Sequence, residues 1–169
     1  DIRFEQRCGT GTAGLRGQLH WVANDATRPP GPVDPPPAGL WVPAAGSTPA
    51  SGNFVYLKSD AGDFVGAGRT ELFTQSNAVL SVVTSPGRID INAIGNRSYN
   101  ISFRPMFPLT QLQPGYYPDA QRLYIGNPAV GGLSFSGDGR ACNVVTGWFV
   151  IDSIAYLNGT VTALDARFE

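Results

Sequence analysis

Alternation of apolar and polar residues with a period of two recurs along the chain and predicts short β-strands. In one segment Leu15, Leu19 and Trp21 alternate with polar neighbours, as in a half-buried strand. No window shows helical spacing of apolar residues over three turns. The fold class predicted from this pattern is all-β, a β-sandwich with strands at 1–7, 15–22, 54–58, 69–74, 79–84, 89–93, 99–103, 133–136, 146–156 and 160–169.

Glycine and proline mark the boundaries of three predicted regions. The chain has 21 glycines and 14 prolines, and eight of the prolines fall within residues 25–52. Because proline fixes φ and lacks an N–H donor, residues 25–52 are predicted to form an extended connector. Residues 1–24 precede it as a strand pair, and residues 53–169 follow it as the sandwich body. In the body, residues 106–130 are predicted to be an irregular loop, and Asn158-Gly159 a tight hairpin turn.

The two ends of the chain have nearly the same sequence. Residues 1–5 are Asp-Ile-Arg-Phe-Glu, and residues 165–169 are Asp-Ala-Arg-Phe-Glu. This match predicts a repeat with a period close to the chain length, in which residues 6–23 are the segment that would follow Glu169. Residues 1–24 then complete their own body, complete the body of a neighbouring subunit, or belong to a long covalent tandem array. The first residue is not methionine, which indicates either a removed leader or a segment of a longer protein.

The two cysteines, Cys8 and Cys142, are too few for a zinc site built from several thiolates. An even count in a Thr-, Asn- and Gly-rich chain permits one disulfide, and the alternative is two unrelated buried thiols. A Cys8–Cys142 bond would join the completing strands to a body, within one chain or between chains. The strands would contribute Leu15, Leu19 and Trp21 as the side chains that fill the incomplete body.

Several motifs resemble a poorly characterised repeat module of secreted, multi-domain bacterial proteins. They are Phe54-Val55-Tyr56-Leu57, Gly62-Asp63-Phe64-Val65-Gly66-Ala67-Gly68, Gly137-Asp138-Gly139-Arg140 with Cys142-Asn143, Thr146-Gly147-Trp148-Phe149, and Asp165-Ala166-Arg167-Phe168-Glu169. The resemblance covers most of residues 1–24 and 53–169. It implies an extracellular β-sandwich with a disulfide, and it implies no established activity.

Catalysis and nucleic-acid binding find little support in the sequence. The single histidine, His20, lies on the polar face of a predicted strand, with no nucleophile motif beside it. The formal net charge of −1 gives no reason to expect nucleic acid or an anionic membrane as a partner. No run of 18 apolar residues occurs. The sequence therefore predicts a protein that is not an enzyme, has no cofactor and has no membrane span.

Two ligand classes have candidate residues. Asp60, Asp63 and Asp138, with Asp152, lie in or beside predicted turns and are weak candidates for calcium ligands. Aspartates in glycine-rich turns more often cap their own backbone. The candidate aromatic platforms for a glycan are Trp41, Tyr116, Tyr117 and Tyr124.

The leading function predicted from the sequence is structural. The chain is expected to be a subunit or repeat of a secreted bacterial filament or cell-surface array, assembled head to tail from copies of itself by strand complementation. The alternative is an extracellular module of a larger protein that binds glycan or calcium.

Overall fold

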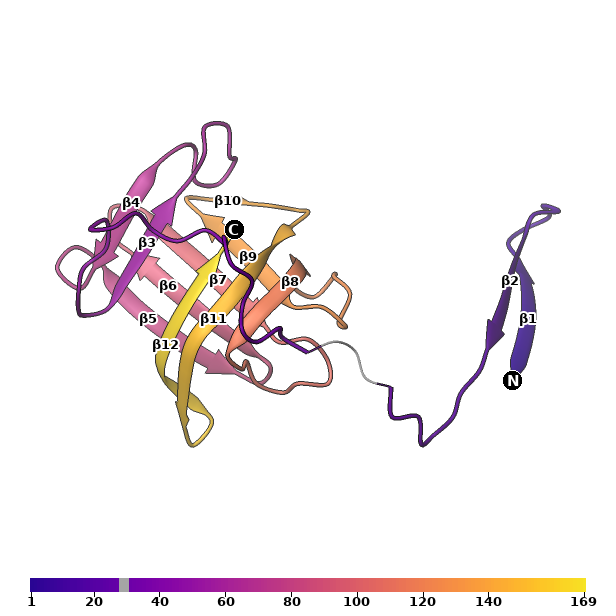
Figure 1. Ribbon diagram of the computed structural model, residues 1–169. Coiled ribbons are helices and arrows are strands. Elements are labelled where there is room, and N and C mark those ends of the chain that lie inside the picture. Colours follow the sequence, from indigo (N-terminus) through magenta and orange to yellow (C-terminus); the bar gives the residue numbers. More distant parts are fainter. Residues whose placement is uncertain (28–30) are drawn as a thin grey trace.

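The computed structural model describes residues 1–27 and 31–169, and in these residues it contains twelve strands and no helix (Figure 1). The predicted all-β class is therefore confirmed. No helix in the described residues is long and apolar enough to cross a membrane. The strands are β1 (Ile2–Arg7), β2 (Gly14–Leu19), β3 (Phe54–Lys58), β4 (Thr70–Thr74), β5 (Val79–Ser85), β6 (Arg88–Ile94), β7 (Ser98–Arg104), β8 (Gly115–Arg122), β9 (Gly132–Gly137), β10 (Arg140–Ala141), β11 (Thr146–Leu157) and β12 (Thr160–Phe168).

One large sheet forms the body, in the order β12-β11-β8-β9-β7-β6-β5, with β10 paired to β9. Its neighbours are antiparallel except for a short parallel contact between β8 and β9. The sheet curls until its two edges meet, where the Val161 N–H donates to Thr84 Oγ at 2.9 Å. No strand ladder joins β12 to β5 among the described residues. The body is therefore a nearly closed, barrel-like sandwich.

Aromatic side chains fill the interior of this sandwich. Tyr117 of β8 and Phe149 of β11 stack with ring centroids 4.3 Å apart, and both are fully buried. Phe103 of β7 lies 5.0 Å from Phe149 and 6.1 Å from Phe168 at the end of β12. The β3–β4 hairpin is a separate two-stranded sheet, and it contributes buried Phe73 to the same core.

Strand β8 corrects the prediction that residues 106–130 form an irregular loop. Pro118 lies within it, and a proline normally excludes a residue from the interior of a sheet because it has no N–H to donate. The β8–β11 register shifts at this point, between the pairs Gly147–Ala120 and Phe149–Tyr117. The bulge leaves Pro118 outside the regular ladder, which is how the strand continues through a proline.

Residues 31–52 of the connector lie on the body. The backbone of Val33 forms an isolated antiparallel bridge with Tyr116 of β8. Further along, Trp41 stacks on Tyr56 of β3 at 6.3 Å, and its carbonyl accepts a hydrogen bond of 3.0 Å from Arg167 of β12. Residues 28–30, which include Pro29 and Pro30 of the predicted connector, lie outside the described residues.

Strands β1 and β2 form a hairpin that pairs with no other described strand. In Figure 1 this hairpin lies apart from the body. The predicted pair of strands is confirmed, but the hairpin does not add to the large sheet of its own chain.

Candidate assembly site

The β1–β2 hairpin has one apolar face without a partner in the structure. Its register pairs Ile2 with Leu19, Phe4 with Gly17 and Gln6 with Leu15, so these residues share a face. Ile2, Phe4, Leu15 and Leu19 are each at least half exposed, and Trp21, just beyond β2, is 79% exposed. Exposed apolar side chains gathered on one face of a sheet make this face a candidate binding surface.

The opposite face of the hairpin is polar, and several of its side chains contact one another. Glu5 accepts hydrogen bonds from Arg7 at 2.6 Å and from Arg16 at 3.1 Å. His20 Nδ1 lies 2.6 Å from an Asp1 carboxylate oxygen. His20 therefore lies on the polar face of the hairpin, beside Asp1.

Phe4 and Gly17 fit each other across the two strands. A Cβ atom at Gly17 would overlap the Phe4 ring, so the ring lies directly over the glycine backbone. The absence of a side chain at residue 17 thus allows the aromatic ring to cover the hairpin's own backbone. The outward surface of the Phe4 ring and the neighbouring apolar side chains stay exposed to solvent.

The end of β12 carries the same residue types in a packed environment. Phe168 pairs with Phe149 across the ladder and contacts Phe135 at 5.8 Å. Glu169 and Trp148 exchange two backbone hydrogen bonds, of 2.9 and 3.1 Å. A Cβ at Gly147 would overlap the Glu169 carbonyl, so this glycine leaves room for the last residue.

The β11–β12 register indicates where a continuation of β12 would lie. Cys8 follows Glu5 by three residues, and Glu169 lies opposite Trp148. A strand that repeated residues 6–8 after Glu169 would therefore place its cysteine opposite Val145, the residue just before β11. Val145 is three residues from Cys142, which is close enough for a disulfide only if the bend at residues 143–144 turns the two thiols together.

Both cysteines are free thiols in this structure. The predicted bond between Cys8 and Cys142 within one chain is therefore not present, because the hairpin that carries Cys8 does not dock on its own body. Cys8 is exposed, and Cys142 is half-buried against the core. A bond between Cys8 of one chain and Cys142 of another stays a prediction.

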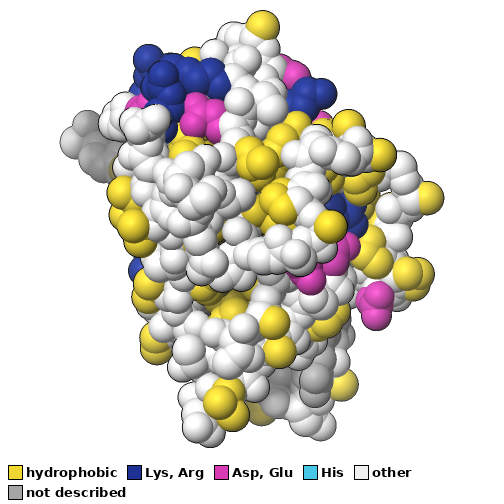
Figure 2. Space-filling model, turned by 90° about the vertical axis from the view of Figure 1, so that its left-hand side faces the viewer, with side chains coloured by type: hydrophobic (Ala, Val, Ile, Leu, Met, Phe, Trp, Pro, Cys, Tyr) yellow, Lys and Arg dark blue, Asp and Glu magenta, His cyan; other side chains and the backbone are white. Residues whose placement is uncertain are grey.

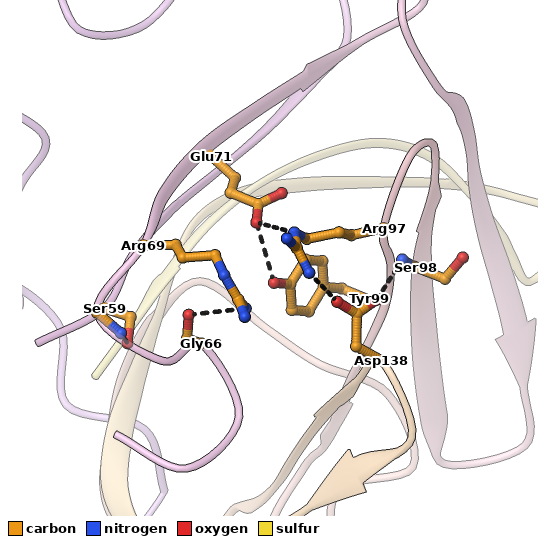
Figure 3. A network of polar contacts seen from close by, with 9 residues as sticks. Ser59, Gly66, Arg69, Glu71, Arg97, Ser98, Tyr99 and Asp138 are labelled. Atoms are coloured by element: carbon orange, nitrogen blue, oxygen red, sulfur yellow. Dashed lines mark hydrogen bonds and ion pairs between the residues drawn. The ribbon is translucent and has the colours of Figure 1, made fainter. Parts of the chain in front are cut away.

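The two glycine-rich motifs, residues 62–68 and 137–140, meet at one end of the body. There they hold the β3–β4 hairpin in place (Figure 3). Asp138 and Gly139 have φ angles of 50° and 76° and form the tight β9–β10 turn. Asp138 lies 2.6 Å from the Arg97 guanidinium, which lies 3.2 Å from Glu71 of β4. Hydrogen bonding by Arg97 lowers the pKa of Asp138, and burial followed by the nearby Glu71 charge raises the pKa of Tyr99.

A second contact joins these two motifs. Arg140 donates to the Phe64 carbonyl at 3.3 Å, and its guanidinium lies 5.8 Å from the centre of the Phe64 ring. Val65, the next residue, is completely buried. In the part of the chain that the structure describes, these motifs therefore act as contacts between secondary-structure elements.

The calcium candidates do not come together. Asp63 accepts hydrogen bonds from the Gly66 N–H at 2.5 Å and from Ser59 at 3.0 Å, and so caps its own loop. Asp138 is paired with Arg97, and Asp152 with Arg167 at 2.8 Å. Within residues 1–27 and 31–169, no group of three or more His, Cys, Asp or Glu side chains, Asp60 included, is placed to hold a metal.

The four candidate sugar platforms have different environments. Tyr117 is completely buried, Trp41 is half-buried against Tyr56, and Tyr116 is half-buried against Trp148 at 6.0 Å. Tyr124 is 74% exposed. Of the four, Tyr124 alone presents most of its ring to solvent.

Other apolar side chains reach the surface of the body itself. Figure 2 shows one face on which hydrophobic groups form a patch among polar surface, with basic groups gathered at an upper corner. Edge strand β5 contributes exposed Val79, Val82 and Val83. These residues are valines of the edge strand β5, whereas the hairpin exposes larger aromatic and aliphatic side chains.

The comparisons with known proteins gave no match: no family model, curated protein or solved structure matches this chain.

Proposed function

We propose that this protein is a structural subunit or repeat of a secreted bacterial filament or cell-surface array. In this proposal, residues 1–24 of one unit complete the body of another. The observation that carries it is one short sequence in two states. At the end of β12 the sequence is packed into a sheet, and in β1 its apolar side chains are exposed.

The match supports a specific partner, a second copy of the body. Residues 1–5 have the residue types that a body already accepts beside β11. They are followed by Cys8 and by β2. A hairpin from another unit that replaces residues 165–169 beside β11 would bring its β2 to the side of the sheet where β12 meets β5, and its cysteine toward Cys142.

Assembly is tested first by intact mass of the full chain under denaturing conditions, before and after reduction. The proposal predicts multiples of the chain mass that collapse to one chain mass when disulfides are reduced. A single species lighter by two hydrogens would instead mean a bond within the chain, and it would refute the staple between subunits.

Non-covalent assembly is tested by sedimentation velocity of the reduced protein. Trp21→Ala removes the most exposed apolar side chain of the hairpin and is expected to shift the protein from oligomer to monomer. His20→Ala is the matched control, because His20 lies on the opposite face of the same segment, and it should leave the distribution unchanged. A wild-type protein that stays monomeric at its highest soluble concentration would rule out this function for the hairpin.

A further inference from the structure

A groove of about 650 Å³ lies on the outer face of the large sheet. Its floor consists of side chains that alternate with the core residues of β6, β7 and β9 and point the other way. Its walls include residues 122–125 after β8 and the segment at Ala141 and Cys142. The polar residues of the floor are Asp90, Asn92, Asn100, Ser102, Ser134 and Ser136.

A hydrogen-bond network fixes the floor. Asn100 donates to the Asn92 side chain at 2.9 Å, and Asn92 donates to Ser81 at 3.3 Å. On the same strands, Ser102 donates to Asp90 at 2.5 Å. Each asparagine amide has two N–H groups and an oxygen with two lone pairs, so capacity for further hydrogen bonds remains on a rigid surface. Such a floor suits a ligand with many hydroxyl groups.

Tyr124 stands in the wall of the groove with an unusual backbone. Its φ of 70° is in the left-handed region, which is unfavourable for a residue with a side chain. Backbone strain of this kind is concentrated at functional sites. The ring is 74% exposed, with the Arg88 guanidinium 5.6 Å from its centre. A flat exposed ring beside hydrogen-bonding groups matches a sugar, which has an apolar face of C–H groups and a rim of hydroxyls.

One end of the groove is rich in arginine. Arg88 of β6 and Arg122 of β8 line it. Arg104 of β7 lies beside Arg88, because it follows Phe103, which pairs with Ile89. Arg88 Nε and two nitrogens of Arg104 are buried without a hydrogen-bond partner among the described residues. Arg88 Nε does lie 2.8 Å from Asp90, but without the angle of a hydrogen bond. Buried guanidinium N–H groups without acceptors favour a bound anion or water.

We propose that this groove binds an acidic oligosaccharide, with a uronate carboxylate at Arg88 and Arg122 and a sugar ring on Tyr124. Among the described lining residues Asp90 is the only carboxylate, so the arginines are in excess. The whole chain has a net charge of −1, so general attraction of polyanions does not account for such binding. No residue of β1 or β2 lines the groove, and the groove shares only Cys142, in its wall, with the proposed disulfide.

The test is affinity electrophoresis of the reduced full chain in gels that contain polygalacturonate, alginate, galactomannan or β-glucan, at physiological salt. The two uronate polymers are expected to retard the protein, and the two neutral polymers are not.

Titration with oligogalacturonides then measures Kd. Tyr124→Ala should weaken binding by about tenfold, and Tyr124→Phe should keep most of the affinity. Arg88→Lys keeps the charge but loses the planar fork and should also weaken binding.

Trp21→Ala is the matched control, because it removes an exposed aromatic ring from a different surface. It should leave retardation unchanged, while Tyr124→Ala should leave sedimentation unchanged. The two proposals therefore fail independently. Retardation by none of the four polymers, equal retardation by neutral and acidic polymers, or binding that survives both Tyr124→Ala and Arg88→Lys would each overturn the groove assignment.

Discussion

The first five and last five residues of this chain share four identities, and they occupy opposite environments. Phe168 lies in the sheet of the body, between the rings of Phe103 and Phe135. Phe4 is 50% exposed and lies over Gly17 of its own hairpin. The alternation of apolar and polar side chains is the same in both segments, so the difference comes from the strands beside them.

This comparison separates what a strand sequence specifies from what its surroundings specify. The pattern is sufficient for both segments to pair as antiparallel strands with one apolar face. To bury that apolar face, other side chains must pack against it. The body supplies such side chains to β12 and not to β1. An unpartnered apolar face on a two-stranded hairpin is what a segment that completes another sheet requires.

The largest expected effect comes from truncating the two phenylalanines one at a time. Phe168→Ala should lower the free energy of unfolding by about 2–4 kcal/mol, below the maximum for a core phenylalanine because Phe168 is only partly buried. Phe4→Ala should change it by less than about 0.5 kcal/mol. Urea unfolding monitored by tryptophan fluorescence measures both, with the reduced monomer at low concentration. Equal losses would mean that the hairpin packs on its own body in solution.

Alkaline pH should destabilise the body and spare the hairpin. The Tyr117 hydroxyl donates to the Gln113 carbonyl and accepts from the Gln113 N–H, both at 2.9 Å. Burial raises its pKa to about 12 from 10.0. The folded state therefore keeps a proton that the unfolded state releases above pH 10. Stability from this group is complete below pH 10, falls as the pH rises, and is lost above pH 12, by about 3 kcal/mol in all.

The matched variant for this pH dependence is Tyr117→Phe. It should be less stable at pH 8, because the Gln113 backbone groups lose their partner. Its stability should fall less steeply between pH 10 and 12, with a remainder from Tyr99 and Tyr156, whose pKa values burial also raises. An unchanged slope in a series of urea titrations would contradict the assignment to Tyr117.

Most of the strands could be predicted from the sequence, because period-two alternation and Asn-Gly or Pro-Gly turns are local signals. The predicted segments at 54–58, 79–84 and 160–169 agree with β3, β5 and β12 to within about one residue. Strand β8 was missed because Pro114 and Pro118 are local signals against a strand. Only the bulge opposite Gly147 and Phe149 resolves that conflict, and it depends on a partner distant in sequence.

The candidate sites were less predictable, because they depend on which outward-facing residues share a surface. Tyr117 and Tyr124 both came from the predicted loop, but one is buried in the core and the other is exposed beside a groove. The floor of that groove joins residues of β6, β7 and β9 as distant as Asp90 and Ser136. No spacing in the sequence indicates that those side chains meet.

A smaller effect is expected from Arg167 and Arg3, which hold the same position in the two matching segments. Arg167 donates to both Asp152 oxygens at 2.8 Å and to the Trp41 carbonyl at 3.0 Å, and the bond to Asp152 raises its pKa. Arg167→Ala should therefore cost about 1 kcal/mol and release the connector near Trp41. Arg3→Ala should have no measurable effect. Limited proteolysis within residues 38–46 and urea unfolding test the pair, and equal protection of both variants would contradict the role of Arg167.

Gly17→Ala should have the smallest effect on folding. It most directly tests the difference between the exposed hairpin and the packed end of β12. A methyl group at this position overlaps the Phe4 ring, so the ring must leave the hairpin's apolar face. Because no described strand of the body pairs with β2, the melting temperature of the reduced monomer should stay within about 1 °C of wild type. Sedimentation velocity should nevertheless show weaker self-association, since the apolar face changes shape. Gly14→Ala, where the added methyl meets only the flexible Glu5 and Arg7 side chains, is the control. If both variants assemble like wild type, the fit of Phe4 over Gly17 has no part in docking. If both lose stability as monomers, the hairpin packs on its own body. The two ends of the chain would then no longer differ in environment.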